Sequence, residues 1–303
     1  MVETSESQPD KKRVLLTGAT GFLGSYIVKK LLEDGHELII LKRSFSNIHR
    51  LQDIWSEIVS YDLDKTDLET PFRDFDRIDA VIHTATVYGR KNEEFTDLFE
   101  ANTVFPMHLL NAAIKFNVST YFNTDTPLDK QLNFYALSKA QFQEWGERLA
   151  KLGKIRFINI KLEQMFGPGD DDSKFPAFVI RKCLSSPELD LTLGEQKRDF
   201  IHIDDVISAY GLLLQKVHLL NAAYQEYELG SGKAISICNF VELVKQLTGS
   251  SIQLNFGAVP YREGEVMYSE ANLVALEGLG WSSKIPLEEG LRQTIPWYSE
   301  NNR

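Results

Sequence analysis

Short apolar runs alternate with helical patterns along the first half of the chain. The runs Arg13–Thr17 and Ala80–His83 are almost wholly apolar, which is typical of strands buried on both faces. Between them, Phe22–Leu32 carries apolar residues at helical spacing and ends before Asp34-Gly35, a helix stop. Further strands are expected at 37–41, 58–61, 120–123 and 155–160, and further helices at 94–116 and 134–152. This alternation predicts a parallel sheet covered by helices on both faces.

The second half of the chain is less regular. It mixes helices, expected at 203–215 and 240–247, with short strands and turns rich in Pro and Gly. We predict an α/β fold with a Rossmann-type, doubly wound parallel sheet over residues 12–162 and a smaller C-terminal lobe over 163–303, with some chain crossing back. Residues 1–11 are polar and lack the apolar segment of a signal peptide, so we expect a disordered tail there.

Composition narrows the classes of partner. The chain has 303 residues, with 43 acidic against 33 basic side chains and a net charge of -10. This balance argues against nucleic acid or an anionic membrane as the main partner. Two distant cysteines, Cys183 and Cys238, form no CxxC pattern, and no apolar run approaches the roughly 20 residues of a membrane span. We therefore expect a cytoplasmic protein that binds any anionic ligand through locally placed Lys and Arg.

A glycine-rich turn follows the first expected strand. TGATGFLG, at residues 17–24, places its glycines in a G-x-x-G-x-x-G spacing between a strand and a helix. Such a turn lets the backbone approach a pyrophosphate at the helix N-terminus. The alternative is a glycine-rich turn without a ligand, but the flanking strands and helix favour dinucleotide binding. The residues predicted to contact the cofactor here are Gly18, Thr20, Gly21, Phe22, Leu23 and Gly24.

The end of the second expected strand predicts which dinucleotide is bound. A NAD site normally has an acid there to accept from the ribose hydroxyls, whereas this chain has Lys42-Arg43-Ser44. Two cations and a hydroxyl suit a 2′-phosphate, so we predict NADP (NADPH) as the cofactor. The alternative is a solvated basic turn. Asp62 and Leu63 are expected to flank the adenine, and Thr84 and Ala85 to approach the middle of the dinucleotide.

Tyr135 and Lys139 form a Y-x-x-x-K pattern on an expected helix. Residues at i and i+4 share one helix face, so both side chains can point into one site. A free tyrosine has a pKa of about 10, and a neighbouring ammonium lowers this pKa by stabilising the phenolate. The pattern is common by chance, but its place directly after the fifth strand of a dinucleotide fold makes it specific.

The motifs TGATGFLG, YALSK, FGPGDD and RDFIHIDDV occur in one order along the chain. Together they resemble the extended short-chain dehydrogenase/reductases, the NAD(P)-dependent epimerase/dehydratases of nucleotide sugars. The resemblance runs from Lys12 nearly to the C-terminus. It implies a seven-stranded Rossmann domain, a substrate lobe that binds a nucleotide-diphosphate sugar, and frequently a homodimer.

The resemblance also implies a catalytic set. Thr124 matches the hydroxyl that holds the sugar oxygen, Tyr135 the general acid, and Lys139 its electrostatic support and ribose anchor, so that Tyr135 and Lys139 also contact the cofactor. The family's V-Y-G is absent, and the spacing from Thr124 to Tyr135 is short, which indicates a trimmed loop. Asp125 is a further candidate catalytic residue, retained from the dehydratase pattern S-T-D-E, but Thr126 stands where the Glu would be. A hydroxyl cannot remove the acidic sugar proton as a carboxylate can, so dehydration is disfavoured.

The remaining candidate residues concern the substrate. Arg198, in the segment RDFIHIDDV, and Arg262, in YREGE, resemble arginines that contact the nucleotide diphosphate, and the alternative for each is a surface ion pair. Thr86 and Phe178 are further expected substrate contacts. Four further residues are interpreted as structural: Asp204, Asp205, His83 and His202. The two aspartates are expected to cap the helix that begins near Ile203. No metal site is expected, because no second ligand stands at a recognisable spacing.

Three functions fit these residues. A 4-epimerase regenerates its cofactor within the site, typically NAD, whereas a net reduction consumes NADPH, so Lys42 and Arg43 favour a reductase. The resemblance then points to 4-ketoreductases of the CDP-abequose and CDP-paratose synthase type, acting on 6-deoxy or 3,6-dideoxy sugars. An epimerase is the alternative enzyme. A non-catalytic NADP sensor on the same fold is the third, and the intact Thr124, Tyr135 and Lys139 count against it.

Overall fold

The computed structural model describes residues 11–220 and 222–301. They form two compact units that are interleaved in the sequence. The first unit holds the described residues through 125, then 129–159 and 210–226; the second holds 126–128, 160–209 and the described residues from 227 onward. The tail expected over residues 1–11 lies, apart from Lys11, outside the described residues.

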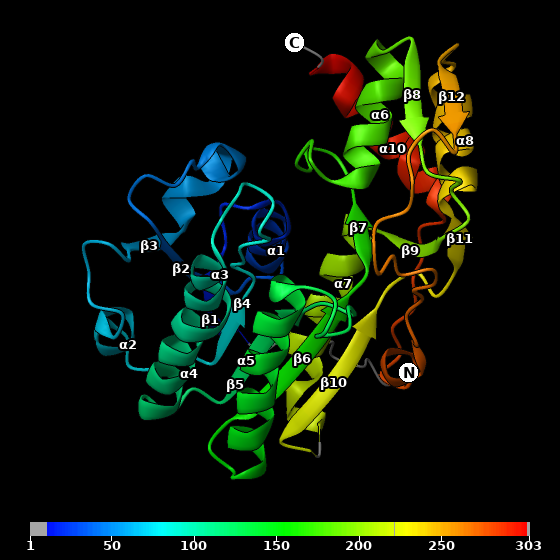
Figure 1. The fold of residues 1–303 in the computed structure, drawn as a ribbon. Coiled ribbons are helices and arrows are strands. Elements are labelled where there is room, and N and C mark those ends of the chain that lie inside the picture. Colours follow the sequence, from blue (N-terminus) through cyan, green and yellow to red (C-terminus); the bar gives the residue numbers. More distant parts are fainter. Residues whose placement is uncertain (1–10, 221, 302–303) are drawn as a thin grey trace, which may run out of the picture. The chain divides into compact units, whose positions relative to one another are not determined.

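The central sheet has the strand order of a doubly wound fold. Within the described residues, seven strands pair in the order β10-β6-β5-β4-β1-β2-β3 (Figure 1). Their bounds are β1 Arg13–Thr17, β2 Glu37–Lys42, β3 Val59–Asp62, β4 Ala80–His83, β5 Thr120–Asp125, β6 Arg156–Leu162 and β10 Tyr224–Leu229. The pairs from β3 through β2, β1 and β4 to β5 are parallel. The predicted Rossmann-type fold is confirmed.

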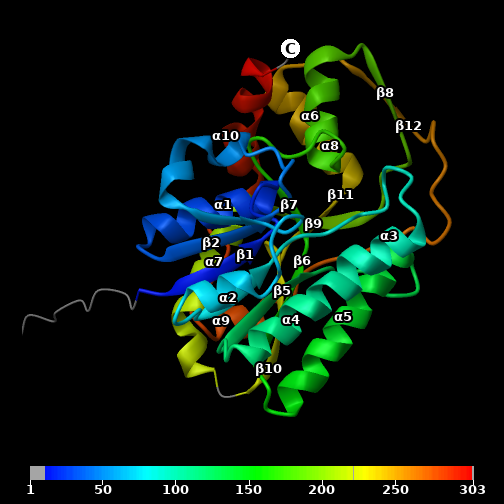
Figure 2. The same ribbon diagram turned by 90° about the vertical axis from the view of Figure 1, so that its left-hand side faces the viewer.

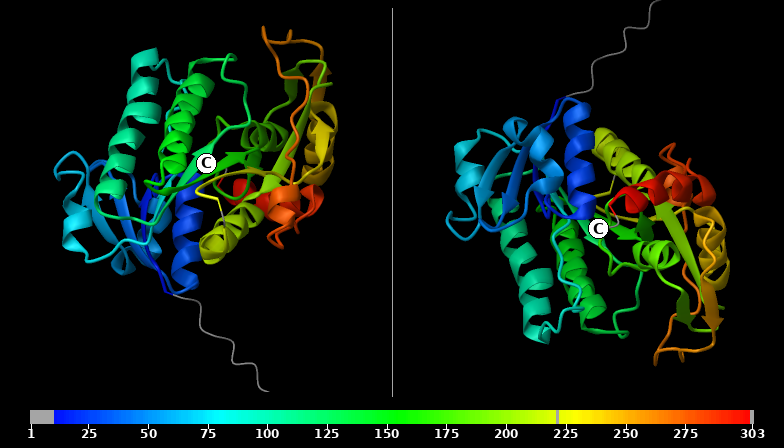
Figure 3. Two further views of the ribbon diagram at one scale, coloured as in Figure 1. Left: turned by 90° about the horizontal axis from the view of Figure 1, so that it is seen from below. Right: turned by 90° about the horizontal axis from the view of Figure 1, so that it is seen from above.

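Helices cover both faces of this sheet. Their bounds are α1 Phe22–Glu33, η1 His49–Glu57, α2 Thr70–Asp74, α3 Phe95–Phe99, η2 Glu100–Val104, α4 Phe105–Lys115 and α5 Phe134–Lys151. Figures 2 and 3 show α4 and α5 on one face and α1 on the other. The helix expected over 94–116 is three joined segments, because Glu100–Val104 is a π-helical turn. Such turns are frequent at functional sites.

One apolar core cluster of the first unit lies between the sheet and helices α4 and α5. Tyr121 on β5 stacks on Phe157 of β6 with ring centroids 5.5 Å apart, and Phe142 of α5 meets both rings edge-on. A Cβ at Gly146 would lie 2.2 Å from the Phe157 ring, so α5 needs glycine there to approach the sheet this closely. This packing fixes the position of α5, which carries Tyr135, against strands β5 and β6.

The second unit is built from short strands and helices. Its elements are β7 Gln164–Phe166, α6 Phe175–Ser185, β8 Glu188–Leu191, β9 Lys197–His202, α7 Ile203–Lys216, β11 Ala234–Ser236, α8 Ile237–Thr248, β12 Gln253–Phe256, α9 Val274–Glu277 and α10 Leu287–Glu300. Strands β11, β9 and β7 form one sheet, and β12 and β8 another. Helix α7 passes into the first unit at Tyr210 and is followed by the short helix η3, Val217–Leu219. Across the described ranges, no helix has both the length and the apolar content to cross a membrane.

Candidate active site and cofactor site

The glycine turn between β1 and α1 has the backbone geometry that a dinucleotide requires. Gly18 has φ +74°, and a Cβ there would lie 2.6 Å from both Thr84 Oγ1 and Ala85 N. A Cβ at Gly24 would lie 2.2 Å from the Gly18 carbonyl oxygen. Glycine at these two positions therefore lets α1 and the segment after β4 close on the turn.

The N-terminus of α1 fits a pyrophosphate. Gly21 precedes the helix, is exposed, and has only the Gly18 carbonyl oxygen near its missing Cβ, at 3.2 Å. The N-cap residue, Gly21, has no side chain with which to cap α1. The first-turn N–H groups, at Phe22 and Leu23, are thus positioned to bind anionic oxygens, aided by the helix dipole. The residues present fit a dinucleotide cofactor.

The basic end of β2 is partly neutralised by the neighbouring strand. Lys42 and Asp62 are register partners on β2 and β3, and their side chains form an ion pair. Ser44 donates from both its N–H and its hydroxyl to Asp64, at 2.6 Å each. Arg43 is exposed, lies 4.8 Å from the Phe45 ring, and makes no ion pair with a described residue. Of the two cations expected at a 2′-phosphate, Arg43 is the one without a carboxylate partner.

The predicted catalytic side chains stand at the end of β5 and at the start of α5. Asn133 caps α5 by accepting from the Ala136 N–H at 2.8 Å, which places Tyr135 and Lys139 one turn apart near the helix N-terminus. Lys139 is only 2% exposed. Burial lowers the pKa of Lys139, and the charge of Asp125 on β5 opposes that shift. The structure thus brings Lys139 into electrostatic contact with Asp125.

Sequence reasoning missed Asn102, which links the segment after β4 to α5. Asn102 is fully buried in the π-helical turn. It accepts from Thr86 Oγ1 at 3.1 Å and from Val87 N at 2.9 Å, and donates to Val87 O at 2.8 Å and Ser138 Oγ at 3.1 Å. These bonds hold Thr86 beside the helix of Tyr135. The available signal was an asparagine within an apolar helical pattern.

Asn159 on β6 was also missed. It is fully buried, donates to Asp125 Oδ2 at 2.9 Å and to Glu226 Oε2 at 3.1 Å, and accepts from Asn123 Nδ2 at 2.7 Å. It therefore fixes the Asp125 carboxylate at the end of β5. The signal was an amide between two isoleucines in the strand expected at 155–160.

His83, at the end of β4, is packed into the core of the first unit. It is fully buried, and its Nδ1 lies 2.7 Å from Thr17 Oγ1. Burial, followed by the charge of Lys139, lowers the pKa of His83 well below its usual range. The ring is therefore neutral and joins the end of β4 to the end of β1, which fits the structural role expected for His83.

In the second unit, the two arginines are linked through Glu265. Arg198 on β9 is largely buried and forms an ion pair with Glu265 at 2.6 Å. The Glu265 N–H donates to the Arg262 carbonyl at 3.1 Å, so this pair anchors the turn that carries Arg262. The Arg262 side chain is exposed. Phe178 lies on another element, α6, where the Lys182 ammonium is 5.8 Å from its ring.

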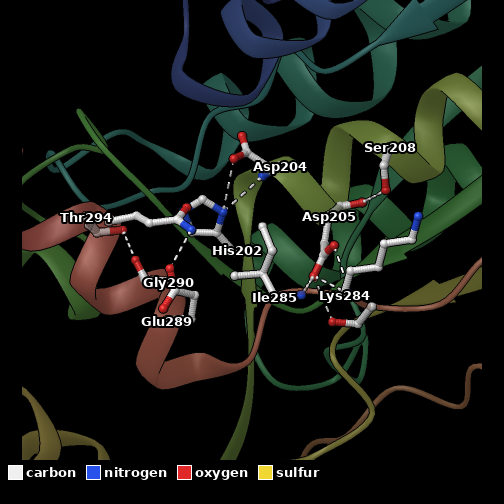
Figure 4. Close-up of polar contacts among 11 residues, drawn as sticks. His202, Asp204, Asp205, Ser208, Lys284, Ile285, Glu289, Gly290 and Thr294 are labelled. Carbon is white, nitrogen blue, oxygen red and sulfur yellow. Dashed lines mark hydrogen bonds and ion pairs between the residues drawn. The ribbon is translucent and has the colours of Figure 1, made fainter.

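The start of α7 is a structural junction (Figure 4). Asp205 is 3% exposed, and its carboxylate accepts bonds of 2.8 to 3.1 Å from the Ser283 hydroxyl and the backbone N–H groups of Lys284 and Ile285. The expectation that Asp205 caps α7 is wrong, because its oxygens join α7 to the segment before α10. The N–H of Asp204 instead donates to His202 Nδ1 at 3.4 Å. Both aspartates keep a structural position.

Comparison with known proteins identifies the family. Residues 14–230 match the NAD dependent epimerase/dehydratase family. The CDP-abequose synthase of Salmonella muenchen is 32% identical over 291 residues, covering 94% of this chain and 97% of that protein. This chain belongs to the NAD-dependent epimerase/dehydratase family. A putative UDP-glucose 4-epimerase of Methanocaldococcus jannaschii is 24% identical over 312 residues, covering 96% of this chain and 99% of that protein.

Solved structures share the fold of this family member. UDP-glucose 4-epimerase of Thermotoga maritima, with UDP-glucose, has a TM-score of 0.82 at 22% identity and covers 96% of this chain and 100% of that one. The dTDP-glucose 4,6-dehydratase of Streptomyces venezuelae, with NAD bound, has a TM-score of 0.82 at 21% identity and covers 96% and 98%. Thr124, Tyr135 and Lys139 all lie within the part of the chain that matches the family, whereas Arg262 lies beyond it.

Proposed function

We propose that this epimerase/dehydratase family enzyme reduces the 4-keto group of a nucleotide-linked 6-deoxy or 3,6-dideoxy sugar with NADPH. The observation that carries the proposal is the basic end of β2, where Arg43 stands exposed without a carboxylate partner among the described residues. A 2′-phosphate is the cofactor group that such a cation recognises. The relatives named CDP-abequose synthase support a role in deoxysugar synthesis.

The residues divide the chemistry as follows. When bound, NADPH would supply the hydride that adds to the keto carbon. Thr124 donates a hydrogen bond to the keto oxygen, and Tyr135 transfers its proton to that oxygen as negative charge develops. The buried ammonium of Lys139 then stabilises the Tyr135 phenolate, since charges interact more strongly in a site shielded from water.

The substrate's diphosphate needs cations, because the chain as a whole is acidic. We assign it to Arg198 and Arg262, with Thr86 and Phe178 as further substrate contacts. The ion pair between Arg198 and Glu265 means that a diphosphate has to compete with, or share, a carboxylate already in place. The affinity for the nucleotide sugar is therefore expected to fall as salt rises.

One observation favours a second function, 4-epimerisation. The Lys42–Asp62 ion pair brings a carboxylate to the end of β2, where NAD sites keep an acid for the ribose hydroxyls. An enzyme that retains NAD returns the hydride to the sugar and needs no external reductant. This function uses the same Thr124, Tyr135 and Lys139.

The deciding experiment measures both reactions on the purified enzyme. With NADPH and a panel of CDP-, dTDP-, GDP- and UDP-linked 4-keto sugars, we expect stoichiometric oxidation of NADPH and release of the reduced sugar. Saturated UDP-hexoses should stay unchanged. Interconversion of the saturated sugars without net change at the nicotinamide absorbance would replace reduction by epimerisation. Tyr135→Phe is the control for the site and should lower turnover roughly a hundredfold.

A further inference from the structure

A buried tyrosine contacts the catalytic threonine. Tyr210 lies on α7, where this helix enters the first unit, and is 1% exposed. Its hydroxyl is 2.7 Å from Oγ1 of Thr124, which stands 86 residues earlier at the end of β5. Burial raises the pKa of Tyr210 far above its ordinary value. The phenol therefore keeps its proton at neutral pH.

The direction of this hydrogen bond follows from the surroundings of the two hydroxyls. Among the described residues, Thr124 is the hydrogen-bond partner of the Tyr210 hydroxyl. A buried O–H that does not donate costs about 1–3 kcal/mol. Thr124 is partly exposed, so its own proton can go to water or a bound molecule. The arrangement of lower free energy is therefore the one in which the Tyr210 hydroxyl donates and the Thr124 hydroxyl accepts.

We propose that Tyr210 is a positioning residue that turns the Thr124 hydroxyl proton toward the reacting sugar oxygen. A threonine hydroxyl rotates about its C–O bond, and a hydrogen bond donated by Tyr210 excludes the orientation in which the Thr124 proton points at Tyr210. The Thr124 proton is then left to donate to the ligand. The same bond polarises Thr124 and strengthens it as a donor. This inference rests on the proposed function only in that Thr124 meets the reacting oxygen.

The effect of Tyr210 is expected in turnover more than in binding. Negative charge grows on the sugar oxygen in the transition state, so a better-aligned donor gains most there. Tyr210→Phe keeps the ring and removes the donor. We expect kcat to fall about fivefold to tenfold, which corresponds to one hydrogen bond, with KM and cofactor affinity unchanged.

Tyr121 provides a matched control. It is another fully buried tyrosine, on the same strand as Thr124, and its hydroxyl has no hydrogen-bond partner among the described residues. Tyr121→Phe removes an equally buried oxygen without touching Thr124. Its kcat should equal that of the unmodified enzyme. A drop as large as that of Tyr210→Phe would show that loss of any buried hydroxyl disturbs the site, and would overturn the proposal.

A double-mutant cycle with Thr124→Val separates positioning from a general structural role. In the Thr124→Val background, Tyr210→Phe should cause no further loss of kcat, because its effect acts through the removed hydroxyl. In Thr124→Ser, which keeps the hydroxyl, the full dependence on Tyr210 should return. Equal losses in the native and Thr124→Val backgrounds, or an unchanged kcat for Tyr210→Phe alone, would contradict the proposal.

The assay uses whichever reaction the unmodified enzyme catalyses, keto reduction or epimerisation, so that an error in the proposed function does not decide this one. Urea unfolding gives a readout that needs no turnover. It is measured on the unmodified protein, Tyr210→Phe, Thr124→Val and the double variant. Tyr210→Phe should shift the unfolding midpoint less in the Thr124→Val background than alone, since both changes remove one bond. Additive shifts would show that the two hydroxyls are not coupled and would overturn the proposal even if no sugar is turned over.

Discussion

Lys139 in the first unit and Asp205 in the second are both charged and almost completely buried, yet their surroundings are opposite. Asp205 accepts hydrogen bonds from three consecutive residues, 283–285. The ammonium of Lys139 makes no hydrogen bond or ion pair with any described residue, and its pKa is lowered by burial against the opposing charge of Asp125. The carboxylate of Asp205 is satisfied by hydrogen bonds within the fold, whereas the ammonium of Lys139 is not.

This difference separates structural from functional burial. A carboxylate whose oxygens are satisfied by its own chain stabilises a junction and has little left to offer a ligand. A buried ammonium keeps three donors for groups that arrive later, at a cost in folding free energy. Perturbed, incompletely paired groups of this kind are typical of active sites. This contrast supports the proposal that the chemistry takes place in the first unit, whereas Asp205 joins α7 to residues 283–285 in the second.

Among these variants, Lys139→Met should change turnover most. We expect kcat to fall roughly a hundredfold or more because the Tyr135 phenolate loses its support, while the free energy of unfolding stays equal or rises. Steady-state turnover and urea unfolding measure the two quantities. Lys151→Met, at the exposed end of the same helix, is the control and should change neither. A Lys139→Met protein that is active, or that unfolds easily, would remove the contrast with Asp205.

Asp205→Ala should show the reverse pattern. Loss of the carboxylate leaves the N–H groups of Lys284 and Ile285 without their acceptor, so we expect about 4 kcal/mol less stability in urea. The kcat of the protein that remains folded should change little. Asp204→Ala, at a side chain 52% exposed, should stay within about 0.5 kcal/mol. If the two variants are equally stable, the junction is not held by Asp205.

Glu163 is a buried carboxyl of the second unit whose pKa, unlike that of a satisfied carboxylate, is raised. It should make the stability of the fold depend on pH. It is 8% exposed, and burial raises its pKa to about 7, although Ser269 Oγ donates to it at 2.7 Å. The folded protein keeps this proton up to about pH 7, whereas the unfolded chain releases it near pH 4.5. Stability should therefore fall as pH rises through that window, by up to about 3 kcal/mol.

Glu163→Gln should remove this part of the pH dependence, as measured by urea unfolding at pH 5 and pH 8. The variant is expected to gain stability relative to the unmodified protein at pH 8, because it has no carboxylate to ionise. Glu288→Gln, at an exposed side chain of α10, should leave the pH profile as it is. Parallel pH profiles for Glu163→Gln and the unmodified protein would mean that Glu163 is ionised in the fold without penalty.

A smaller effect is expected at the end of β2, where Arg43 has no carboxylate partner among the described residues and Lys42 has one. Arg43→Ala should weaken NADPH binding about tenfold, near 1.4 kcal/mol, and leave NADH unchanged. Lys42→Ala should matter less, because Lys42 is already bound to Asp62. Fluorescence titration of the unmodified protein and of both variants with NADPH and NADH measures these affinities. Equal affinity of the unmodified protein for NADPH and NADH would contradict the 2′-phosphate assignment.

The sequence predicted features in which neighbouring residues act together. β1, the glycine turn and the start of α1 are continuous in sequence, and their glycines are needed for close backbone approach. Tyr135 and Lys139 share a helix face because of helical periodicity alone. The π-helical turn inside the helix expected over 94–116 was not predictable, because a one-residue widening leaves the apolar pattern almost unchanged.

What the sequence determined by itself was therefore local: strand and helix order, the cofactor turn, and the i, i+4 pair on α5. Tertiary structure alone decided the partners, because a side chain finds them on other strands and helices, at positions that the sequence spacing does not specify. Lys42 meets Asp62 across adjacent strands, and Asp125 meets Asn159 from the next strand along. Tyr210 reaches Thr124 from a helix 86 residues away. No spacing rule in the sequence connects such pairs, since only the folded sheet brings them within hydrogen-bond distance.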